Sequence, residues 1–282
     1  MSRPFGAHMS VAGGLDTAFL RARTVGATAL QIFTKNASRW SVPPLTEAEI
    51  TAFKTAWRAS GIGPVMAHDA YLINLAAPDD GNWAKSKAAM REELQRCAAL
   101  GIPYLIAHPG AHLGAGVDAG ISRIRAALTE ILAASDPAVR LLLENTAGQG
   151  SYLGHEFAHL ARLMEGFGKR VGICFDSCHA HAAGYDLASA EGYARTMAEF
   201  DREIGFAWLH AFHLNDCQKP CGCRVDRHAH IGAGTIGVDG FARLVNDERF
   251  VKLPMVLETP KGDDGESMDR VNLELLRQLA GE

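Results

Sequence analysis

The feature that most constrains this chain is a regular alternation of short apolar runs with longer segments of helical periodicity. The apolar runs read as strands at Phe5–His8, Ala29–Phe33, Pro64–His68, Tyr104–His108, Val139–Glu144, Val171–Asp176, Trp208–His213 and Met255–Glu258. Helix-like stretches rich in Ala, Leu, Arg and Glu separate them, among them Leu15–Val25, Thr46–Ser60, Lys85–Leu100, Val117–Ala134, Ala188–Ile204 and Glu266–Leu279. Repeated strand–helix units predict a parallel sheet. Eight of them in 282 residues predict a closed (β/α)8 TIM barrel, an α/β fold.

An open doubly wound sheet is the structural alternative. Such a sheet usually carries a G-x-G-x-x-G phosphate turn after its first strand, and the segment Ser10–Gly14 does not match that pattern. No linker, charge block or low-complexity tract divides the chain. We therefore expect residues 1–282 to form a single barrel domain with its binding loops at the C-terminal face of the strands.

Composition narrows the class of protein further. Hydrophobic residues make up 48% and charged residues 21% of the chain, which is typical of a globular protein. No apolar stretch is long enough to span a membrane, and the N-terminus lacks the apolar segment of a signal peptide. Six cysteines without a secretory signal argue against a disulfide framework, so we expect a cytoplasmic location. The net charge of −4 provides no overall basic surface for nucleic acid.

The ends of the predicted strands carry the strongest functional signal. Seven of the eight strands end in an ionisable residue: His8, His68, His108, Glu144, Asp176, His213 and Glu258. In a parallel barrel these ends meet at one mouth, where the active site lies. Imidazoles and carboxylates packed together need compensating cations, and a set without thiolates suits zinc, manganese or iron.

Two further pairs follow in the loops. His179 comes three residues after Asp176, and Asp226 and His228 form a D-x-H pair whose side chains point the same way in extended backbone. Each pair alone is a weak signal. Together with the strand ends they supply more ligands than one metal ion can use.

Several blocks around these residues stand out, in chain order: His68-Asp-Ala-Tyr-Leu-Ile-Asn74, His108-Pro-Gly-Ala-His112, Leu143–Gly150, Cys174–His179, His213-Leu-Asn-Asp216, Arg224-Val-Asp-Arg-His228 and Leu257-Glu-Thr259. Together they resemble the endonuclease IV family of zinc-dependent apurinic/apyrimidinic endonucleases. The similarity runs from about residue 5 to residue 280. It implies a (β/α)8 barrel with three zinc ions, one position being able to take Mn²⁺ or Fe²⁺. The nine implied ligands fall into three sets: His68, His108 and Glu144; Glu144 shared with Asp176, His213 and Glu258; and His179, Asp226 and His228.

The resemblance also implies an activity in base excision repair. The expected reaction is hydrolysis of the phosphodiester 5′ to an abasic site, leaving a 3′-hydroxyl and a 5′-deoxyribose phosphate, together with 3′-phosphatase or 3′-phosphodiesterase activity. We expect hydroxide held between the first two metals to attack phosphorus, with Glu144 as the catalytic residue that orients or deprotonates it. Three divalent ions would bring the formal charge of −4 to +2, concentrated where a phosphate must sit. The expected partner is double-stranded DNA with abasic sites or blocked 3′ ends, and the expected state is a monomer.

The resemblance places DNA contacts in the loops at the same mouth. Tyr71 and Leu72 match residues that wedge into the duplex, which is a known way to bend DNA. The other candidates for DNA binding are basic or amide side chains: Asn36, Arg39, Gln149, Arg224 and Arg227, with Lys35 and Asn74 beside them.

Two other functions use part of the same signal. A divalent-metal sugar isomerase or epimerase also has His, Glu and Asp at a barrel mouth, but it leaves the Asp226–His228 set and the Tyr71-Leu72 pair without a role. A DNA-damage binding protein without catalysis is the second alternative, and an intact ligand set argues against it. The sequence leaves open the roles of Cys217, Cys221 and Cys223 and the DNA contacts of residues 35–40, where the basic residue stands one position later than is usual in the family.

Overall fold

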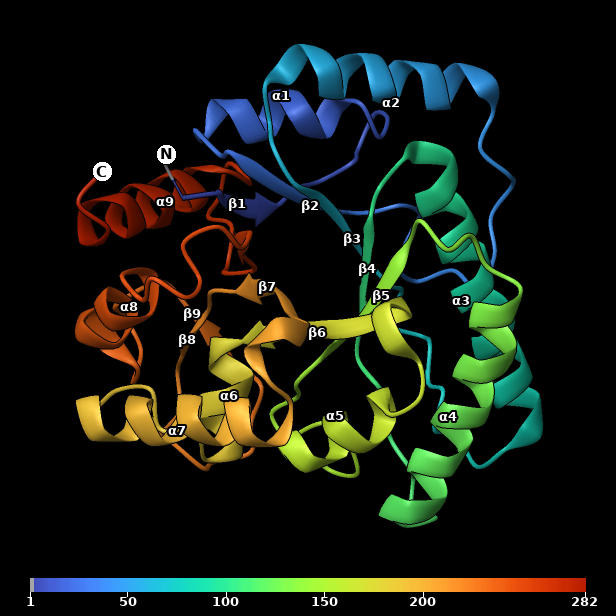
Figure 1. Cartoon of the computed structure of the whole chain (residues 1–282). Helices are drawn as coiled ribbons and strands as arrows, with labels where there is room; N and C mark the ends of the chain where they lie inside the picture. The colour runs from blue at the N-terminus through green and yellow to red at the C-terminus, as the bar shows by residue number, and fades with distance from the viewer. Residues whose placement is uncertain (1–2) are drawn as a thin grey trace.

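Eight parallel strands close into a barrel in the computed structural model, which describes residues 3–282 (Figure 1). The strands are β1 (Phe5–His8), β2 (Ala29–Phe33), β3 (Val65–His68), β4 (Tyr104–Ala107), β5 (Arg140–Glu144), β6 (Val171–Asp176), β7 (Leu209–His213) and β10 (Met255–Leu257). Neighbours follow chain order, and β1 closes the ring against β10. The predicted (β/α)8 fold is confirmed, with each strand within one residue of its predicted bounds.

Helices surround the barrel (Figure 1). They are α1 (Thr17–Thr24), α2 (Glu47–Ser60), α3 (Asp80–Leu100), α4 (Val117–Ala133), α5 (Phe157–Met164), α6 (Ser177–Ala183), α7 (Ala190–Glu203), α8 (Gly237–Val245) and α9 (Ser267–Leu279), with short 3-10 turns at Gly168–Arg170 and Phe206–Trp208. The prediction for α3 began five residues late. The Asp79 side chain accepts a hydrogen bond from Asn82 N at 2.8 Å and so starts the helix before its apolar pattern begins.

Alternation along the strands explains why ionisable side chains lie above an apolar layer inside the barrel. Successive strand side chains point to opposite faces, so every second residue faces the barrel axis. Six inward residues form one small buried cluster: Met66, Ile106, Leu142, Cys174, Ala211 and Val256. Two positions after each of them come, in the same order, His68, His108, Glu144, Asp176, His213 and Glu258. The chain therefore stacks a layer of ionisable groups directly on a layer of apolar ones.

Gly6 allows β1 and β2 to approach each other closely. A Cβ atom at this position would lie 2.0 Å from the backbone oxygen of Ala29, which no side chain can accommodate. Arg3 N donates to the Glu282 carboxylate at 2.9 Å, so the two ends of the described chain also lie together (Figure 1). The barrel is thus closed where the chain begins and ends.

A small antiparallel ladder brings a long loop back to the mouth. Strand β8 (Asp216–Cys217) pairs with β9 (His228–Ala229), with Cys217 opposite His228. This pairing closes the loop of residues 218–227, which carries Asp226, and places His228 beside Cys217. No helix within residues 3–282 is both long and apolar enough to cross a membrane.

Candidate metal centre

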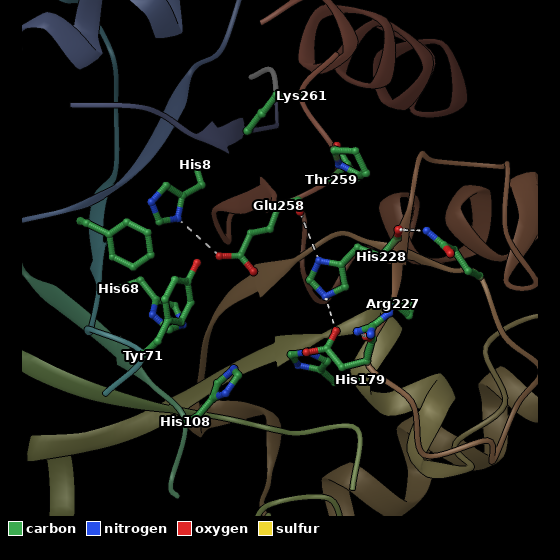
Figure 2. A pocket seen from close by; sticks show the side chains of 14 residues that line it. His8, His68, Tyr71, His108, His179, Arg227, His228, Glu258, Thr259 and Lys261 are labelled. Atoms are coloured by element: carbon green, nitrogen blue, oxygen red, sulfur yellow. Dashed lines mark hydrogen bonds and ion pairs between the residues drawn. The ribbon is translucent and has the colours of Figure 1, made fainter. Parts of the chain in front are cut away.

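A cavity of about 600 Å³ opens at the C-terminal ends of the barrel strands. Figure 2 shows His108, His179, His228 and Glu258 around one space, with Tyr71 at its edge. The lining also includes His8, Phe33, His68, Gln218, Asp226, Arg227, Thr259, Pro260 and Lys261. This is the size of cavity that holds a small ligand or one nucleotide.

The nine candidate ligands come together in three groups. Within each group the ligand atoms lie within 4.8 Å of one another. The groups are His68, His108 and Glu144; Glu144, Asp176, His213 and Glu258; and His179, Asp226 and His228. Glu144 belongs to two groups, so the structure gathers the side chains in the sets that the resemblance implies. Their binding of metal stays a prediction.

Close contacts without hydrogen-bond geometry mark the centre of the cluster. Glu144 Oε1 lies 3.0 Å from His213 Nδ1 and 3.1 Å from His179 Nδ1. Yet Glu144 Oε1, His213 Nδ1, His179 Nε2 and His228 Nε2 are all buried and have no hydrogen-bond partner among residues 3–282. Buried polar atoms without a partner are costly and rare, and here they converge. The donor set therefore fits divalent cations, which imidazole nitrogens and carboxylate oxygens bind together.

Backbone carbonyls orient three of the imidazoles. In each ring Nδ1 lies within hydrogen-bond distance of a carbonyl oxygen, which fixes the proton on Nδ1 and turns Nε2 towards the cluster. The pairs are His68 with Asp69 at 2.9 Å, His179 with Asn145 at 2.9 Å, and His228 with Glu258 at 3.2 Å. Metal-binding histidines are held in this way.

His213 is held differently. Its Nε2 lies 2.7 Å from the side-chain oxygen of Gln31, so that Nδ1 faces the cluster. Gln31 Nε2 also donates to Glu258 Oε1 at 2.6 Å and approaches His8 Nδ1 at 3.0 Å. One buried amide therefore contacts two of the candidate ligands.

The carboxylate of Asp176 is fixed by the helix that follows it. Asp176 caps α6, because its Oδ1 accepts a hydrogen bond from His179 N at 2.7 Å. Its Oδ2 accepts from Asn215 Nδ2 at 2.6 Å, and the same Asn215 accepts from Glu258 N at 2.8 Å. The spacing between Asp176 and His179 is thus that of a capping turn, which places both at the mouth.

Without cations the cluster is balanced by protons. Burial alone lowers the pKa of His68, but the hydrogen bond to Glu144 and the charges of Asp69 and Glu144 outweigh it and raise the pKa to about 9. Burial also lowers the pKa of His179 and of His213. Nearby carboxylates outweigh it at His179, and Cys174 together with nearby carboxylates outweighs it at His213, so both pKa values lie well above the usual value. The pKa of Glu144 would be raised by burial, yet the facing imidazoles hold it well below its usual range. Positive charge is what this site requires.

Thiols lie beside the third group. Cys178 groups with Asp176 and His228 as a set of ligand atoms within 4.8 Å, which the sequence did not indicate. Its Sγ contacts Arg227 O at 3.6 Å. Cys217 is buried, Cys221 is exposed, and no disulfide forms in the described part of the chain.

The candidate DNA-binding side chains lie at the mouth with differing exposure. Tyr71 is 75% exposed and packs edge-on against Phe33, with ring centroids 5.3 Å apart, while Leu72 is half-buried. Arg227 lines the cavity. Asn36, Arg39 and Arg224 are exposed and Gln149 is half-buried. Their contacts with DNA stay predictions.

Two of the expected loop contacts are wrong. Lys35 is buried, and its Nζ bonds to Glu92 Oε1 at 3.1 Å and to Trp40 O at 3.0 Å, so its charge is used inside the protein. The amide of Asn74 donates to Ala111 O and accepts from Ala111 N, which fastens the loop after β3 to the loop after β4. Both side chains therefore hold loops within the protein.

Sequence reasoning missed Gln31 and Lys261. Gln31 was missed because only the residues at strand ends were considered and Gln31 lies in mid-strand. It is nevertheless the only polar residue of the run Ala29–Phe33, and it faces inward. Lys261 lines the cavity while its Nζ contacts Asp269 at 2.7 Å. A polar residue within an otherwise apolar barrel strand was the signal that could have found Gln31.

Known proteins match this chain along nearly its whole length. Residues 19–279 match the family described as xylose isomerase-like TIM barrel. The chain is 54% identical to a probable endonuclease 4 from Chloroflexus aurantiacus, covering 98% of this chain and 97% of the relative. It is 50% identical to a probable endonuclease 4 from Geobacter sulfurreducens, covering 99% and 95%.

Solved structures distinguish a relative with similar sequence from proteins that share only the fold. Endonuclease IV from Thermus thermophilus superimposes with a TM-score of 0.87 at 36% identity, covering 99% of both chains. A D-psicose 3-epimerase superimposes with a TM-score of 0.74 at 14% identity, which shows a shared fold alone. The chain therefore belongs to the endonuclease IV family, within the xylose isomerase-like TIM barrels.

Proposed function

We propose that the protein is a DNA-repair endonuclease that cleaves the backbone at abasic sites. The proposed reaction hydrolyses the phosphodiester 5′ to the abasic site and leaves a 3′-hydroxyl and a 5′-deoxyribose phosphate. The observation that carries this proposal is the convergence of nine imidazole and carboxylate side chains, several with unpartnered ligand atoms, at the mouth of a chain whose relatives are named probable endonuclease 4.

Three divalent ions, most simply zinc, would occupy the three groups. One position could take Mn²⁺ or Fe²⁺, since His, Asp and Glu ligands also suit those ions. Bound there, the ions would lower the pKa of an attacking water and neutralise the charge of the phosphoryl oxygens.

Glu144 is the proposed catalytic residue. It is fully buried and belongs to two of the three groups. Its Oε1 has no hydrogen-bond partner within residues 3–282, so this oxygen could face an ion and orient the water on that ion against the phosphate. The contacts of His68 and His108 with the other oxygen, at 3.2 and 3.4 Å, keep the carboxylate from rotating.

Tyr71 and the loop between β8 and β9 would receive the DNA. An abasic nucleotide costs little to extrude from the duplex, because no base stacking is lost. Tyr71 stands exposed beside the cavity and Leu72 follows it, so the pair can fill the gap in the stack. Arg227 at the cavity and exposed Arg224, Asn36, Arg39 and Gln149 would contact the backbone, positioning the phosphate.

The same cavity would admit a blocked 3′ end. A phosphate or phosphodiester that blocks a 3′ end presents the same P–O3′ bond to the same side chains, without the downstream strand. We therefore propose 3′-phosphatase and 3′-phosphodiesterase activity as well. All nine candidate ligands belong to one chain, so a single 282-residue domain acting as a monomer would suffice.

A sugar epimerase would use only part of this site. Its proton transfers need one or two ions over a closed sugar pocket, and the group of His179, Asp226 and His228 would have no role in them. The exposed ring of Tyr71 at the rim also suits a large polymer better than a small sugar.

The test is incubation with a duplex that carries one abasic site, with and without a chelator. The expected result is chelator-sensitive incision on the 5′ side with a 3′-hydroxyl product that a polymerase extends. Intact duplex after incubation with metal-replete protein, or epimerisation of a ketose instead, would overturn the proposal.

A further inference from the structure

Gln31 lies within the barrel, in the middle of a strand rather than at its end. It is fully buried in β2, and its register partners are His8 on β1 and Met66 on β3. An amide in an apolar barrel core costs free energy unless its polar atoms are bonded. Here both ends of the amide are bonded, and both partners belong to the candidate metal centre.

The two partners fix the orientation of the amide. The Glu258 carboxylate accepts only, so the group 2.6 Å from its Oε1 is the NH₂ of Gln31. The carbonyl oxygen then faces His213, and Nε2 of that ring donates to it at 2.7 Å. A flipped amide would set oxygen against carboxylate and NH₂ against the imidazole N–H.

The fixed amide selects one form of His213. In the neutral ring that can bind an ion, the proton is on Nε2 and the lone pair of Nδ1 points to Glu144 Oε1 at 3.0 Å and to Glu258 Oε2 at 3.2 Å. The second NH₂ hydrogen approaches His8 Nδ1 at 3.0 Å, which leaves Gln31 fully bonded. Gln31 thus aims an imidazole nitrogen and a carboxylate oxygen into the same group of ligand atoms.

We propose that Gln31 is a positioning residue that holds His213 and Glu258 as a pair on one divalent ion, the ion of the group Glu144, Asp176, His213 and Glu258. This inference rests on the proposed function, since it assumes that the group binds an ion. Backbone carbonyls do the same work for His68, His179 and His228. Gln31 is therefore the one place among these four where substitution can remove the support and leave the ligands in place.

The test compares metal retention by the wild-type protein and three variants. Gln31→Met keeps the length of the side chain and removes its hydrogen bonds to His213, Glu258 and His8. Gln31→Asn keeps the amide but shortens its reach, and it carries the test should Gln31→Met not fold. Tyr193→Phe is the matched control, because it deletes one partly buried side-chain hydrogen bond, to Asp247 at 2.8 Å, on the outer helix α7.

Each metal-loaded protein is dialysed against graded chelator, its ions are counted, and the visible spectrum of its Co²⁺ form is recorded. We expect both Gln31 variants to release one ion at a chelator activity about 10–100-fold lower than the wild type does, with a changed Co²⁺ spectrum. Their kcat should fall by a larger factor than their KM changes. The Tyr193→Phe variant should lower the melting temperature with no change in ion retention.

Wild-type ion retention and spectrum in folded Gln31→Met or Gln31→Asn would overturn this inference and leave the proposed function intact. A wild-type protein that binds no ion would overturn both.

Discussion

Nδ1 of His213 and Oε1 of Glu144 lie 3.0 Å apart, both fully buried, yet neither atom has a hydrogen-bond partner anywhere in the described chain. Two polar atoms so close would normally bond or separate. The arrangement is stable when a positively charged partner, either a proton or a metal ion, accepts a lone pair from each. This relationship indicates a cation between the two side chains.

Glu144→Gln should abolish incision, with kcat lowered roughly 100-fold or more, while binding of abasic DNA largely survives. The amide removes a negative charge shared by two groups without changing the size of the side chain. Steady-state kinetics and a gel-shift assay measure the two effects. The same substitution at Glu191, exposed on α7, should change neither. Full activity of Glu144→Gln would remove this residue from the mechanism.

Asp226→Asn should remove one ion and leave the others. Asp226 lies 3.3 Å from both His179 and His228 and belongs to the third group alone. Metal analysis after dialysis should therefore show one ion fewer than in the wild type. Asp118→Asn, which changes an aspartate side chain that is 89% exposed on α4, should keep the wild-type content. Loss of every ion, or of none, would contradict three separable groups.

Zinc uptake should release protons at pH 7. In the ion-free protein the pKa of His68 is about 9, so the ring is protonated at neutral pH and must lose its proton to bind a metal. Apparent zinc affinity should therefore rise between pH 6 and pH 8.5, about tenfold per pH unit for each proton displaced. Calorimetry in buffers of different ionisation enthalpy counts the protons. An affinity that is constant or falls over this range would show that protons do not occupy the site.

The double variant Tyr71→Ala, Leu72→Ala should lose affinity for abasic duplex while retaining its ions. Tyr71 is 75% exposed, so its removal costs little stability but takes away the ring that would fill the gap in the base stack. Fluorescence anisotropy measures the affinity, which we expect to fall about tenfold. A control with Leu20→Ala and Val271→Ala, two exposed apolar residues on α1 and α9, should bind as the wild type does. Equal affinity of all three proteins would refute the wedge.

Much of the fold could be predicted because the apolar and ionisable layers of the barrel appear as a regular pattern along each strand's sequence. Every second side chain of a barrel strand points inward. An apolar inward residue such as Met66, followed two positions later by His68, therefore indicates both a strand and its C-terminal end at the barrel mouth. The same pattern on the other strands predicted which side chains share the mouth. Helices α5, α6 and α8 were not predicted, since they are seven to nine residues long and give little periodicity.

The contacts that support the site could not be predicted from position along the chain. Lys35 and Asn74 lie in loops at the correct face, but the partners that bury their polar groups come from α3 and from the loop after β4. Gln31 is close to His213 and Glu258 only because the ring closes β1 against β10, which brings β2 near residues 182 and 227 positions away in sequence. Such pairings depend on closure of the barrel, which one strand's sequence does not encode.

The most direct test of a three-ion centre is the mass of the folded protein, measured by native mass spectrometry after purification without chelators. We expect a species heavier than the polypeptide by three divalent ions, and its mass should fall to that of the bare chain on denaturation. A folded species that carries none or only one would contradict a three-ion centre.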